Sequence, residues 1–441
     1  MGFPISMTVP AAFTAPLPAK ADVVVIGGGV IGVMSAWQLA QRGLRVVLCE
    51  KGRVAGEQSS RNWGWVRQQG RDAAELPLMI EARQMWQTLA ADCGEDLGYR
   101  ETGVLYIANK PKDVARFEAF MALARQHALD TRMLTPDQVL AMLPGANPNW
   151  PGGLLGGLWT ASDGRAEPWQ AVPAMARAAV RAGVTIIEDC AVRSLDVTAG
   201  RVTGVVTEQG RIACDHAVLA GGAWSALFLG NLGLRIPQLS VLSTVAQTPP
   251  MPEIFPGGAT DNTFAFRRRI DGGYSIAHYE FHEFFIGPDA FRNFRAFLPE
   301  LRGSLFDRSY RPAAPAGYPD AWRTPRRWSP DAASPFEAMR ILDPKPSKGA
   351  LKIVQDRFAS AFPALGRPEI ACAWAGMIDT MPDVVPVIDH AAALPGLVVA
   401  TGMCGHGFGI GPAVGRVVAD LVTGRAPGHD LARFRMTRFG G

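Results

Sequence analysis

The sequence predicts an α/β protein, in which a Rossmann-like domain carries an inserted α+β domain built on an antiparallel sheet. Three observations support this fold class. Residues 22–50 contain, in order, an apolar strand, a glycine turn, a helix and a second strand. Segments of similar character recur at 169–225 and 371–422, and the regions between them contain strands with alternating apolar and polar residues.

The first of these segments is a dinucleotide-binding unit. After the buried strand at 23–26, Gly27, Gly29 and Gly32 form a GxGxxG pattern. The first glycine makes a tight turn, the second lets the backbone approach a pyrophosphate, and the third lets the helix pack against the strand. Glu50 ends the next strand, where a carboxylate binds a ribose hydroxyl and repels a 2′-phosphate. The unit therefore predicts NAD or FAD rather than NADP.

The domain boundaries follow from this alternation of segments. We assign residues 21–75, 155–232 and 371–441 to the dinucleotide-binding domain, and residues 76–154 and 233–370 to the substrate-binding domain inserted into it. Residues 1–20 are rich in proline and alanine, and we expect them to form a flexible tail.

The composition is that of a globular protein and excludes several other classes. The 441 residues are 48% hydrophobic and 19% charged, and the net charge of +4 comes from scattered arginines, so no nucleic-acid surface is predicted. The six cysteines have no zinc-ligand spacing, and we predict no metal site. We find neither a signal peptide nor an apolar run of about 20 residues, and we therefore expect a cytoplasmic protein without a membrane span. An oligomer is possible.

Five sequence blocks resemble the D-amino acid oxidase and sarcosine oxidase family of FAD-dependent amine oxidoreductases. The resemblance extends from residue 21 to residue 421. The blocks, in chain order, are 27–32 with Glu50, 59–64, 220–225, 374–376 with 380–383, and 402–412.

The resemblance implies that FAD is the cofactor and that its binding residues come from all five blocks and from Val192. The expected FAD-binding residues are Gly27, Gly29, Val30, Ile31, Gly32, Glu50, Lys51, Ser59, Ser60, Arg61, Asn62, Val192, Ala220, Gly221, Trp224, Gly376, Asp383, Gly405, His406, Gly407, Phe408 and Gly409. The glycine loop at 405–411 leads into a helix whose N-terminal N–H groups can stabilise negative charge on a reduced flavin. Sarcosine oxidases attach FAD through a cysteine near the position of Gly376, and because that cysteine is missing here we expect non-covalent FAD.

Three departures from the family pattern concern the substrate and the electron acceptor. Amino-acid oxidases of the family carry a carboxylate-binding arginine where this chain has Ile378. Arg67 lies one residue from the position of another such arginine in sarcosine oxidases, and it is equally consistent with a structural ion pair. Lysines near the flavin in relatives are replaced by Ser275 and Gly409. The acceptor, O2 or another electron carrier, therefore stays open.

Four residues are candidates for the catalytic site: His406, Tyr274, His278 and Arg67. The stretch at 274–282 alternates, and Tyr274, His278 and Phe281 would line an aromatic amine pocket or simply pack within a half-buried strand. His406 would polarise the flavin, contact substrate, or only bond to its own loop.

The favoured hypothesis is an FAD-dependent oxidoreductase that oxidises the C–N bond of an amine or amino acid to an imine by hydride transfer to flavin N5. Two alternatives stay open. In the first alternative, the chain is a catalytically silent FAD-binding protein used for assembly or binding. In the second, it is a flavin monooxygenase fed by NAD(P)H. The second alternative lacks a further GxGxxG-like unit in the sequence.

Overall fold

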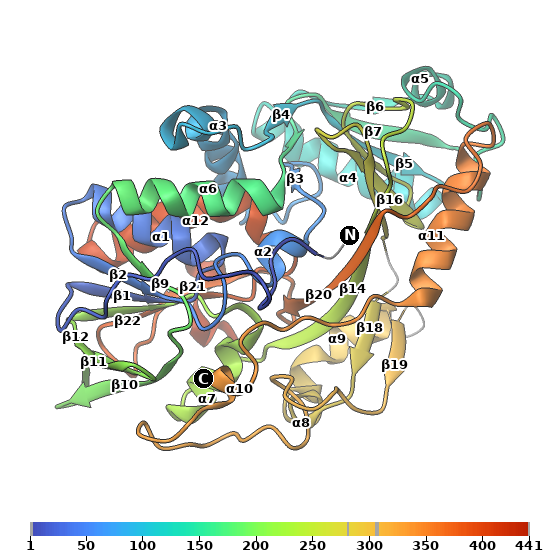
Figure 1. Ribbon diagram of the computed structural model, residues 1–441. Coiled ribbons are helices and arrows are strands. Elements are labelled where there is room, and N and C mark those ends of the chain that lie inside the picture. Colours follow the sequence, from blue (N-terminus) through green and yellow to red (C-terminus); the bar gives the residue numbers. More distant parts are fainter. Residues whose placement is uncertain (1–2, 280–281, 305–307, 440–441) are drawn as a thin grey trace.

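A computed structural model describes residues 3–279, 282–304 and 308–439. Figure 1 shows two bodies side by side, a sheet covered by helices on the left and a larger sheet on the right. The two bodies confirm the predicted fold class.

The left-hand body is built on a six-stranded sheet in the order β21-β22-β13-β1-β2-β9. All its pairings are parallel except that of β21 with β22. Its central strands are apolar throughout because helices and a second sheet bury both faces. The strands are β1 (Val23–Ile26), β2 (Val46–Cys49), β9 (Thr185–Ile187), β13 (His216–Leu219), β21 (Val387–His390) and β22 (Leu397–Thr401).

Helices and a small sheet cover this body on both sides. On one side, α1 packs closely on α12, since a Cβ at Gly415 would lie 2.6 Å from the backbone of Met34. The helices there are α1 (Val30–Gln41), α3 (Leu76–Cys93), α6 (Pro168–Arg181) and α12 (Gly407–Thr423). On the other side lie β10 (Val192–Thr198), β11 (Arg201–Thr207), β12 (Gly210–Ala213) and α7 (Ser225–Asn231).

The right-hand body is a ten-stranded, mostly antiparallel sheet in the order β19-β18-β14-β17-β16-β15-β5-β7-β6, with β20 also paired to β14. Its strands are β5 (Val104–Ala108), β6 (Thr131–Leu134), β7 (Gly156–Thr160), β14 (Leu239–Gln247), β15 (Gly258–Thr260), β16 (Phe264–Arg268), β17 (Tyr274–His278), β18 (His282–Phe285), β19 (Arg308–Arg311) and β20 (Cys372–Thr380). Its helices are α4 (Pro111–Gln126), α5 (Pro136–Met142), α8 (Pro288–Arg292), α9 (Phe294–Ser304) and α11 (Lys348–Ala361). The short helix α10 (Pro335–Ala338) lies against the left-hand body, where the ring of Phe336 packs on Trp224 with centroids 5.8 Å apart.

Short elements complete the chain. They are α2 (Gln58–Arg61), the small sheet of β3 (Trp65–Val66), β4 (Arg100–Glu101) and β8 (Gly164–Arg165), and three 3₁₀ turns at Gly222–Trp224, Ala432–Phe434 and Met436–Phe439.

Two strands extend the substrate sheet beyond the predicted boundaries. Both β7 and β20 lie in segments that the sequence analysis assigned to the dinucleotide-binding domain, yet they pair within the ten-stranded sheet. In particular, β20 pairs with β14 from Leu239 opposite Thr380 to Gln247 opposite Cys372. An apolar strand pattern indicates that a strand is buried but does not indicate which sheet it joins. The domain boundaries at β7 and β20 could therefore not be located from the sequence.

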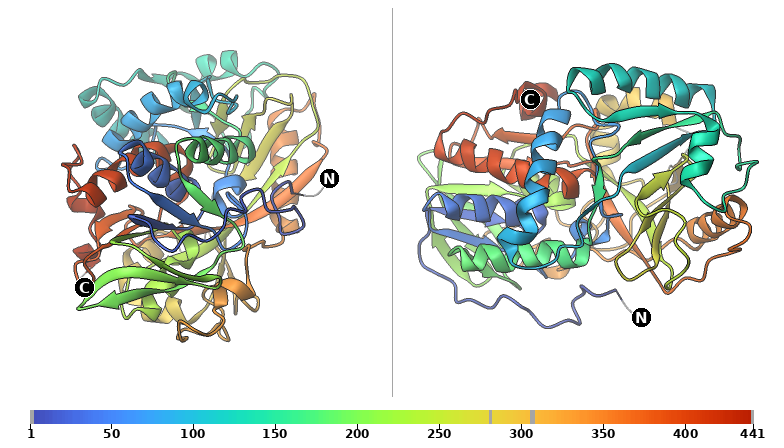
Figure 2. Two further views of the ribbon diagram at one scale, coloured as in Figure 1. Left: turned by 60° about the vertical axis from the view of Figure 1, so that its left-hand side comes forward. Right: turned by 90° about the horizontal axis from the view of Figure 1, so that it is seen from above.

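Residues 3–20 lie along the dinucleotide-binding body, in contrast to the flexible tail that their composition predicts (Figure 2). Thr14 bridges to Ile187 and Lys20 to Ala213. The ring of Phe3 stacks on Trp169 with centroids 5.5 Å apart. Apolar and backbone contacts thus fix a segment whose composition alone predicts disorder.

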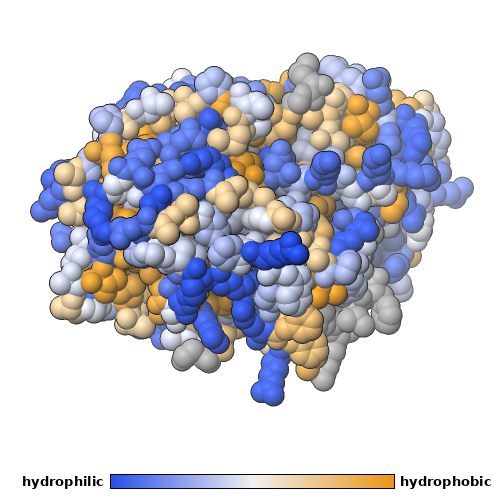
Figure 3. All heavy atoms as spheres, turned by 60° about the horizontal axis from the view of Figure 1, so that its bottom comes forward, coloured by the Kyte–Doolittle hydropathy of each residue, from blue (hydrophilic) through white to orange (hydrophobic). Residues whose placement is uncertain are grey.

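The surface and the helices carry no sign of a membrane span within the described parts of the chain. Hydrophilic and hydrophobic side chains are interspersed over the face in Figure 3. None of the helices in residues 3–279, 282–304 and 308–439 combines the length and hydrophobicity needed to cross a bilayer.

Candidate active site

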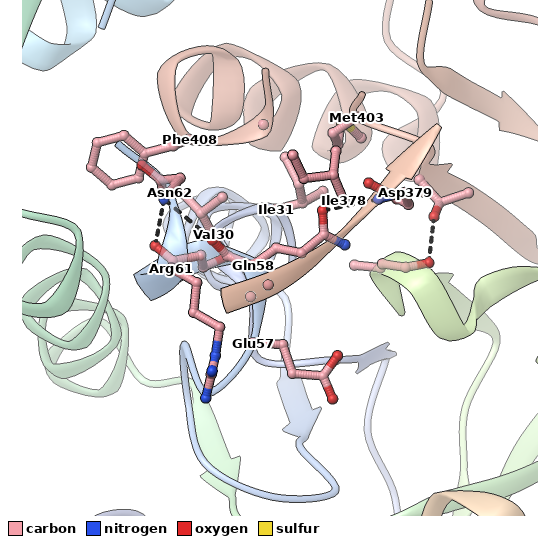
Figure 4. A pocket seen from close by; sticks show the side chains of 18 of the residues that line it. Val30, Ile31, Glu57, Gln58, Arg61, Asn62, Ile378, Asp379, Met403 and Phe408 are labelled. Carbon is pink, nitrogen blue, oxygen red and sulfur yellow. Dashed lines mark hydrogen bonds between the residues drawn. The ribbon is translucent and has the colours of Figure 1, made fainter. Parts of the chain in front are cut away.

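A large cavity lies where the two bodies meet, and segments from both ends of the chain form its wall. Its empty volume, including the mouth, is ≈ 1910 Å³. The lining includes residues 26–31 at the end of β1, 49–51 at the end of β2, 219–222 at the end of β13, residues 376, 378 and 379 of β20, and 403–408 at the start of α12. Figure 4 shows how side chains from these segments converge.

The glycines after β1 form a cradle that no larger residue can replace. Gly27 has φ +107°, and a Cβ there would lie 2.5 Å from the carbonyl oxygen of Ala220. A Cβ at Gly32 would lie 1.9 Å from the carbonyl oxygen of Gly27. Gly29 begins α1 without a side-chain cap, and the Val30 N–H donates to Ser59 Oγ at 2.8 Å. This helix N-terminus at the cavity wall fits a pyrophosphate.

Glu50 lies at the same end of the cavity, as the motif predicts. Its carboxylate accepts hydrogen bonds from the N–H groups of Gly28 at 2.6 Å and Gly52 at 2.7 Å. Burial raises the pKa of the Glu50 carboxyl to about 7. Nearby, Lys51 Nζ pairs with Glu57 at 2.6 Å and lies 4.4 Å from the ring centroid of Trp224. The arrangement fits a ribose hydroxyl donating to Glu50.

The sequence analysis missed several polar residues of the cavity, among them Gln58 and Asp379 (Figure 4). Asp379 is buried, and its Oδ2 accepts from the Gly402 N–H at 2.9 Å. Within the described part of the chain, its Oδ1 has no hydrogen-bond partner. A buried acceptor without a partner beside a cavity fits a ligand that carries hydroxyl or N–H groups. The available signal was one acidic residue within the apolar run of β20.

The cavity brings together most of the predicted cofactor residues. Those that line it are Gly27, Gly29, Val30, Ile31, Glu50, Lys51, Ser59, Arg61, Asn62, Val192, Ala220, Gly221, Trp224, Gly376, Gly405, His406, Gly407 and Phe408. Gly32, Ser60, Asp383 and Gly409 are not part of the lining. Asp383 instead binds Arg438 at 2.9 Å, and the carbonyl of Gly409 accepts from Trp86 at 2.9 Å. These residues support the wall from behind.

The end of the cavity away from Glu50 is aromatic and positively charged. Trp63, Trp65 and Tyr279 line it, together with the guanidinium groups of Arg67 and Arg71. Arg71 is 5% exposed, and its Nη1 has no hydrogen-bond partner among the residues that the structure describes. Burial, with the neighbouring Arg67 charge, lowers the pKa of Arg71 to about 10. This end therefore fits an anionic group attached to an apolar one.

Two of the predicted catalytic residues lie elsewhere, which corrects their expected position. The buried Tyr274 hydroxyl donates to the Phe255 carbonyl at 3.0 Å and accepts from the Ile254 N–H at 2.9 Å. His278 shares this face of β17, and neither residue lines the cavity.

The opposite face of β17 is directed to the cavity. Ala277 packs on Val245 and Trp374, and Tyr279 lies in the wall. His282 also lines the cavity and was likewise missed, whereas Phe281 lies outside the described residues. Alternation shows that a strand has two different faces but does not show which one meets a ligand.

A comparison with known protein families decides what this cavity holds. The model of the FAD dependent oxidoreductase family matches residues 22–421. The chain belongs to this family. The family prediction made from the five blocks is confirmed, and FAD is the cofactor on which its members depend.

Among solved structures, L-amino acid deaminase of Proteus myxofaciens, in complex with anthranilate, is similar with a TM-score of 0.91 and 31% identity. The match covers 98% of this chain and 96% of that one. L-amino acid deaminase of Proteus vulgaris matches with a TM-score of 0.90 and 28% identity, over 98% and 99% of the two chains.

Among curated relatives, glycine oxidase of Geobacillus kaustophilus is 24% identical over 95% of this chain and 97% of its own. Mouse mitochondrial sarcosine dehydrogenase is 29% identical over 53% of this chain. That match spans 26% of the mouse enzyme, and the match to mouse dimethylglycine dehydrogenase spans 44%. The chain thus spans less than half the length of these two relatives.

FAD fits the lining from end to end. The α1 N-terminus and Glu50 would hold its pyrophosphate and adenine ribose, and Asp379 with the loop at 403–408 would hold its ribityl chain and ring. The flavin would then meet the aromatic end that carries Arg67 and Arg71.

Proposed function

We propose that this protein oxidises the Cα–N bond of an α-amino acid to an imine, using non-covalently bound FAD. The observation that carries this proposal is the position of Arg67 and Arg71 at the aromatic end of the FAD cavity. It narrows the substrate from amines in general to amines with a carboxylate, although the family's usual arginine is replaced by Ile378.

The charge balance supports a carboxylate at this end. Arg71 Nε donates to the backbone carbonyl of Arg67 at 3.2 Å, which fixes the Arg71 side chain against the turn that carries Arg67. The carboxylate of Glu75 lies 3.9 Å from Arg71 Nη1, too far for a hydrogen bond. A guanidinium with a free buried N–H binds a substrate carboxylate strongly, because the alternative is an unsatisfied charge.

The chain's own residues orient the substrate and exclude water. Bound FAD would accept a hydride from the substrate Cα. Arg67 and Arg71 hold the carboxylate, and Trp63 and Tyr279, whose ring centroids are 5.9 Å apart, enclose the side chain. An amine reacts in its neutral form, so the site must also favour loss of the ammonium proton.

The state of the cysteines supports non-covalent FAD. Cys404 lines the cavity, and its Sγ donates to the Gly402 carbonyl at 3.0 Å. Burial raises the pKa of the Cys404 thiol, and burial and the neighbouring Cys190 likewise raise that of Cys49. A protonated thiol is a poor nucleophile. We expect acid precipitation to release all the flavin into the supernatant.

The electron acceptor, the oligomeric state and the cytoplasmic location stay predictions. Ser275, at the position of a flavin-facing lysine in relatives, accepts from Arg267 at 3.2 Å and does not line the cavity. We therefore favour an acceptor other than O2.

Anaerobic bleaching of the flavin tests the proposed function. Phenylalanine should reduce the FAD-loaded protein, and 2-phenylethylamine, which lacks the carboxylate, should do so at least about tenfold less efficiently. Arg71→Met should lower the efficiency of flavin reduction by phenylalanine roughly ten- to a hundredfold. Arg211→Met, which breaks an exposed ion pair, should leave this efficiency unchanged. If a broad amino-acid panel leaves the flavin oxidised, the protein is a silent flavoprotein. Equally efficient reduction of the flavin by phenylalanine and by 2-phenylethylamine would exclude a role of the two arginines in binding a substrate carboxylate.

A further inference from the structure

A glutamate–histidine pair lies at the substrate end of the cavity. His406 Nδ1 is 2.9 Å from Glu75 Oε2 and 3.1 Å from Oε1. Glu75 directly precedes α3, and its side chain is fully buried. The His406 backbone N–H is already used, since it donates to the Met403 carbonyl at 2.7 Å. The hydrogen bond between the two side chains is therefore separate from the backbone hydrogen bonds that hold the loop.

The pair fixes which ring nitrogen meets the cavity. His406 lines the cavity and Glu75 does not. Because a carboxylate only accepts hydrogen bonds, Nδ1 must carry the proton, and the neutral ring then presents the lone pair of Nε2 on its opposite edge.

Burial and the charges of two arginines keep the His406 ring neutral. The groups that face it are Arg67, Arg71 and Glu75. Burial lowers the pKa of His406 to about 4, with the Arg71 charge acting in the same direction and Glu75 against it. At neutral pH the imidazole is thus an acceptor placed beside two guanidinium donors.

We propose that His406 Nε2 accepts a hydrogen bond from the substrate's amino group, and that Glu75 is the positioning residue that sets its tautomer. The inference rests on the proposed function and deepens it. Arg67 and Arg71 recognise the carboxylate, His406 recognises the nitrogen, and together they select an α-amino acid over either a plain amine or a plain acid.

The test compares two ligands that differ only in the amino group. α-Methylphenylalanine has no hydrogen on Cα and cannot be oxidised there, and 2-methyl-3-phenylpropanoate is its counterpart without nitrogen. Each is titrated into the FAD-loaded protein, and the change in flavin absorbance gives its Kd. The wild type should bind the amino ligand roughly ten- to a hundredfold more tightly.

Paired variants separate recognition from folding. His406→Asn keeps a donor for Glu75 but lacks the far nitrogen, and it should reduce the ratio of the two Kd values to about one. His406→Gln places an oxygen near the position of Nε2 and should restore part of the ratio. Glu75→Leu should also abolish the preference, whereas Glu75→Gln, which still accepts from Nδ1, should keep it within about threefold.

The chain contains a matched control pair. His429 Nε2 lies 2.5 Å from Glu81 Oε2, and neither residue lines the cavity. His429→Asn and Glu81→Leu should leave the ratio of Kd values unchanged.

Three outcomes would overturn the inference: a wild type with no preference for the amino ligand, a full preference in His406→Asn, or equal losses in Glu75→Gln and Glu75→Leu. Bleaching by phenylalanine in the same wild-type preparation would leave the proposed function standing.

Discussion

At the scale of single residues, the cofactor end of the cavity depends on groups with little tolerance for change. Gly27 and Gly32 leave no space for a Cβ, and the Glu50 carboxylate is held by two backbone N–H groups. These residues could be predicted because each belongs to a local motif, in which the spacing of residues along the chain fixes their positions in the turn. Tyr274 and His278 could not, because the choice between two strand faces depends on the neighbouring sheet.

Glu50 gives the FAD-free protein a specific pH dependence. Its folded pKa of about 7 lies above the ordinary value of 4.5, so its protonated form favours folding. This contribution is fully present below pH 4.5 and is lost as the pH rises through about 7. The melting temperature of wild type minus that of Glu50→Gln should therefore fall between pH 5 and pH 8, as measured by calorimetry without FAD. A difference that rises with pH would contradict this assignment.

At the scale of elements, residues 335–343, here called the strap, close the adenine side of the cavity. Phe336 of α10 lines the cavity, and Lys51 Nζ donates to the carbonyls of Met339 at 2.9 Å and Arg340 at 2.8 Å. The Arg340 guanidinium pairs with Glu208 at 2.6 Å. The strap was not predictable, because a short segment held by ion pairs to distant residues has no periodic pattern.

Loosening the strap should speed the loss of FAD. Arg340→Ala removes the pair with Glu208 and the bond to the Lys51 carbonyl at 2.8 Å, and we expect FAD to dissociate about tenfold faster. The rise of flavin fluorescence after dilution measures this rate. Asp331→Ala, which breaks an exposed contact with Arg211, is the control and should release FAD at the wild-type rate. Equal rates in all three proteins would mean that the strap does not retain the cofactor.

At the scale of the whole molecule, one buried ion pair connects the two bodies. Glu167, which precedes α6, binds Arg267 of β16 at 2.7 Å and 3.0 Å, and both side chains are at most 2% exposed. Arg269 lies 3.6 Å from the same carboxylate. The charge pattern of the sequence, in which residues 267–269 are a run of three arginines, predicted a solvated surface, whereas Arg267 and Arg269 are buried.

Breaking this pair should destabilise both bodies together. Arg267→Met leaves the Glu167 carboxylate buried with the Ile270 N–H at 3.0 Å and the longer contact to Arg269, and we expect a loss of roughly 3–5 kcal/mol in the free energy of unfolding. Urea titration followed by circular dichroism measures it. Arg177→Met, which breaks a partly exposed pair with Glu95, should cost at most about 1 kcal/mol. A loss in Arg267→Met no greater than in the control would show that the buried pair adds nothing to stability.

The cavity's origin from both ends of the chain sets the time at which FAD is captured. The wall needs residues 27–31 and also residues 403–408, which a ribosome makes much later. At about 5–20 residues per second, roughly 20–70 seconds separate the emergence of these two parts. We therefore expect that a nascent chain cannot retain flavin until residues 403–408 have emerged and joined residues 27–31 in the wall.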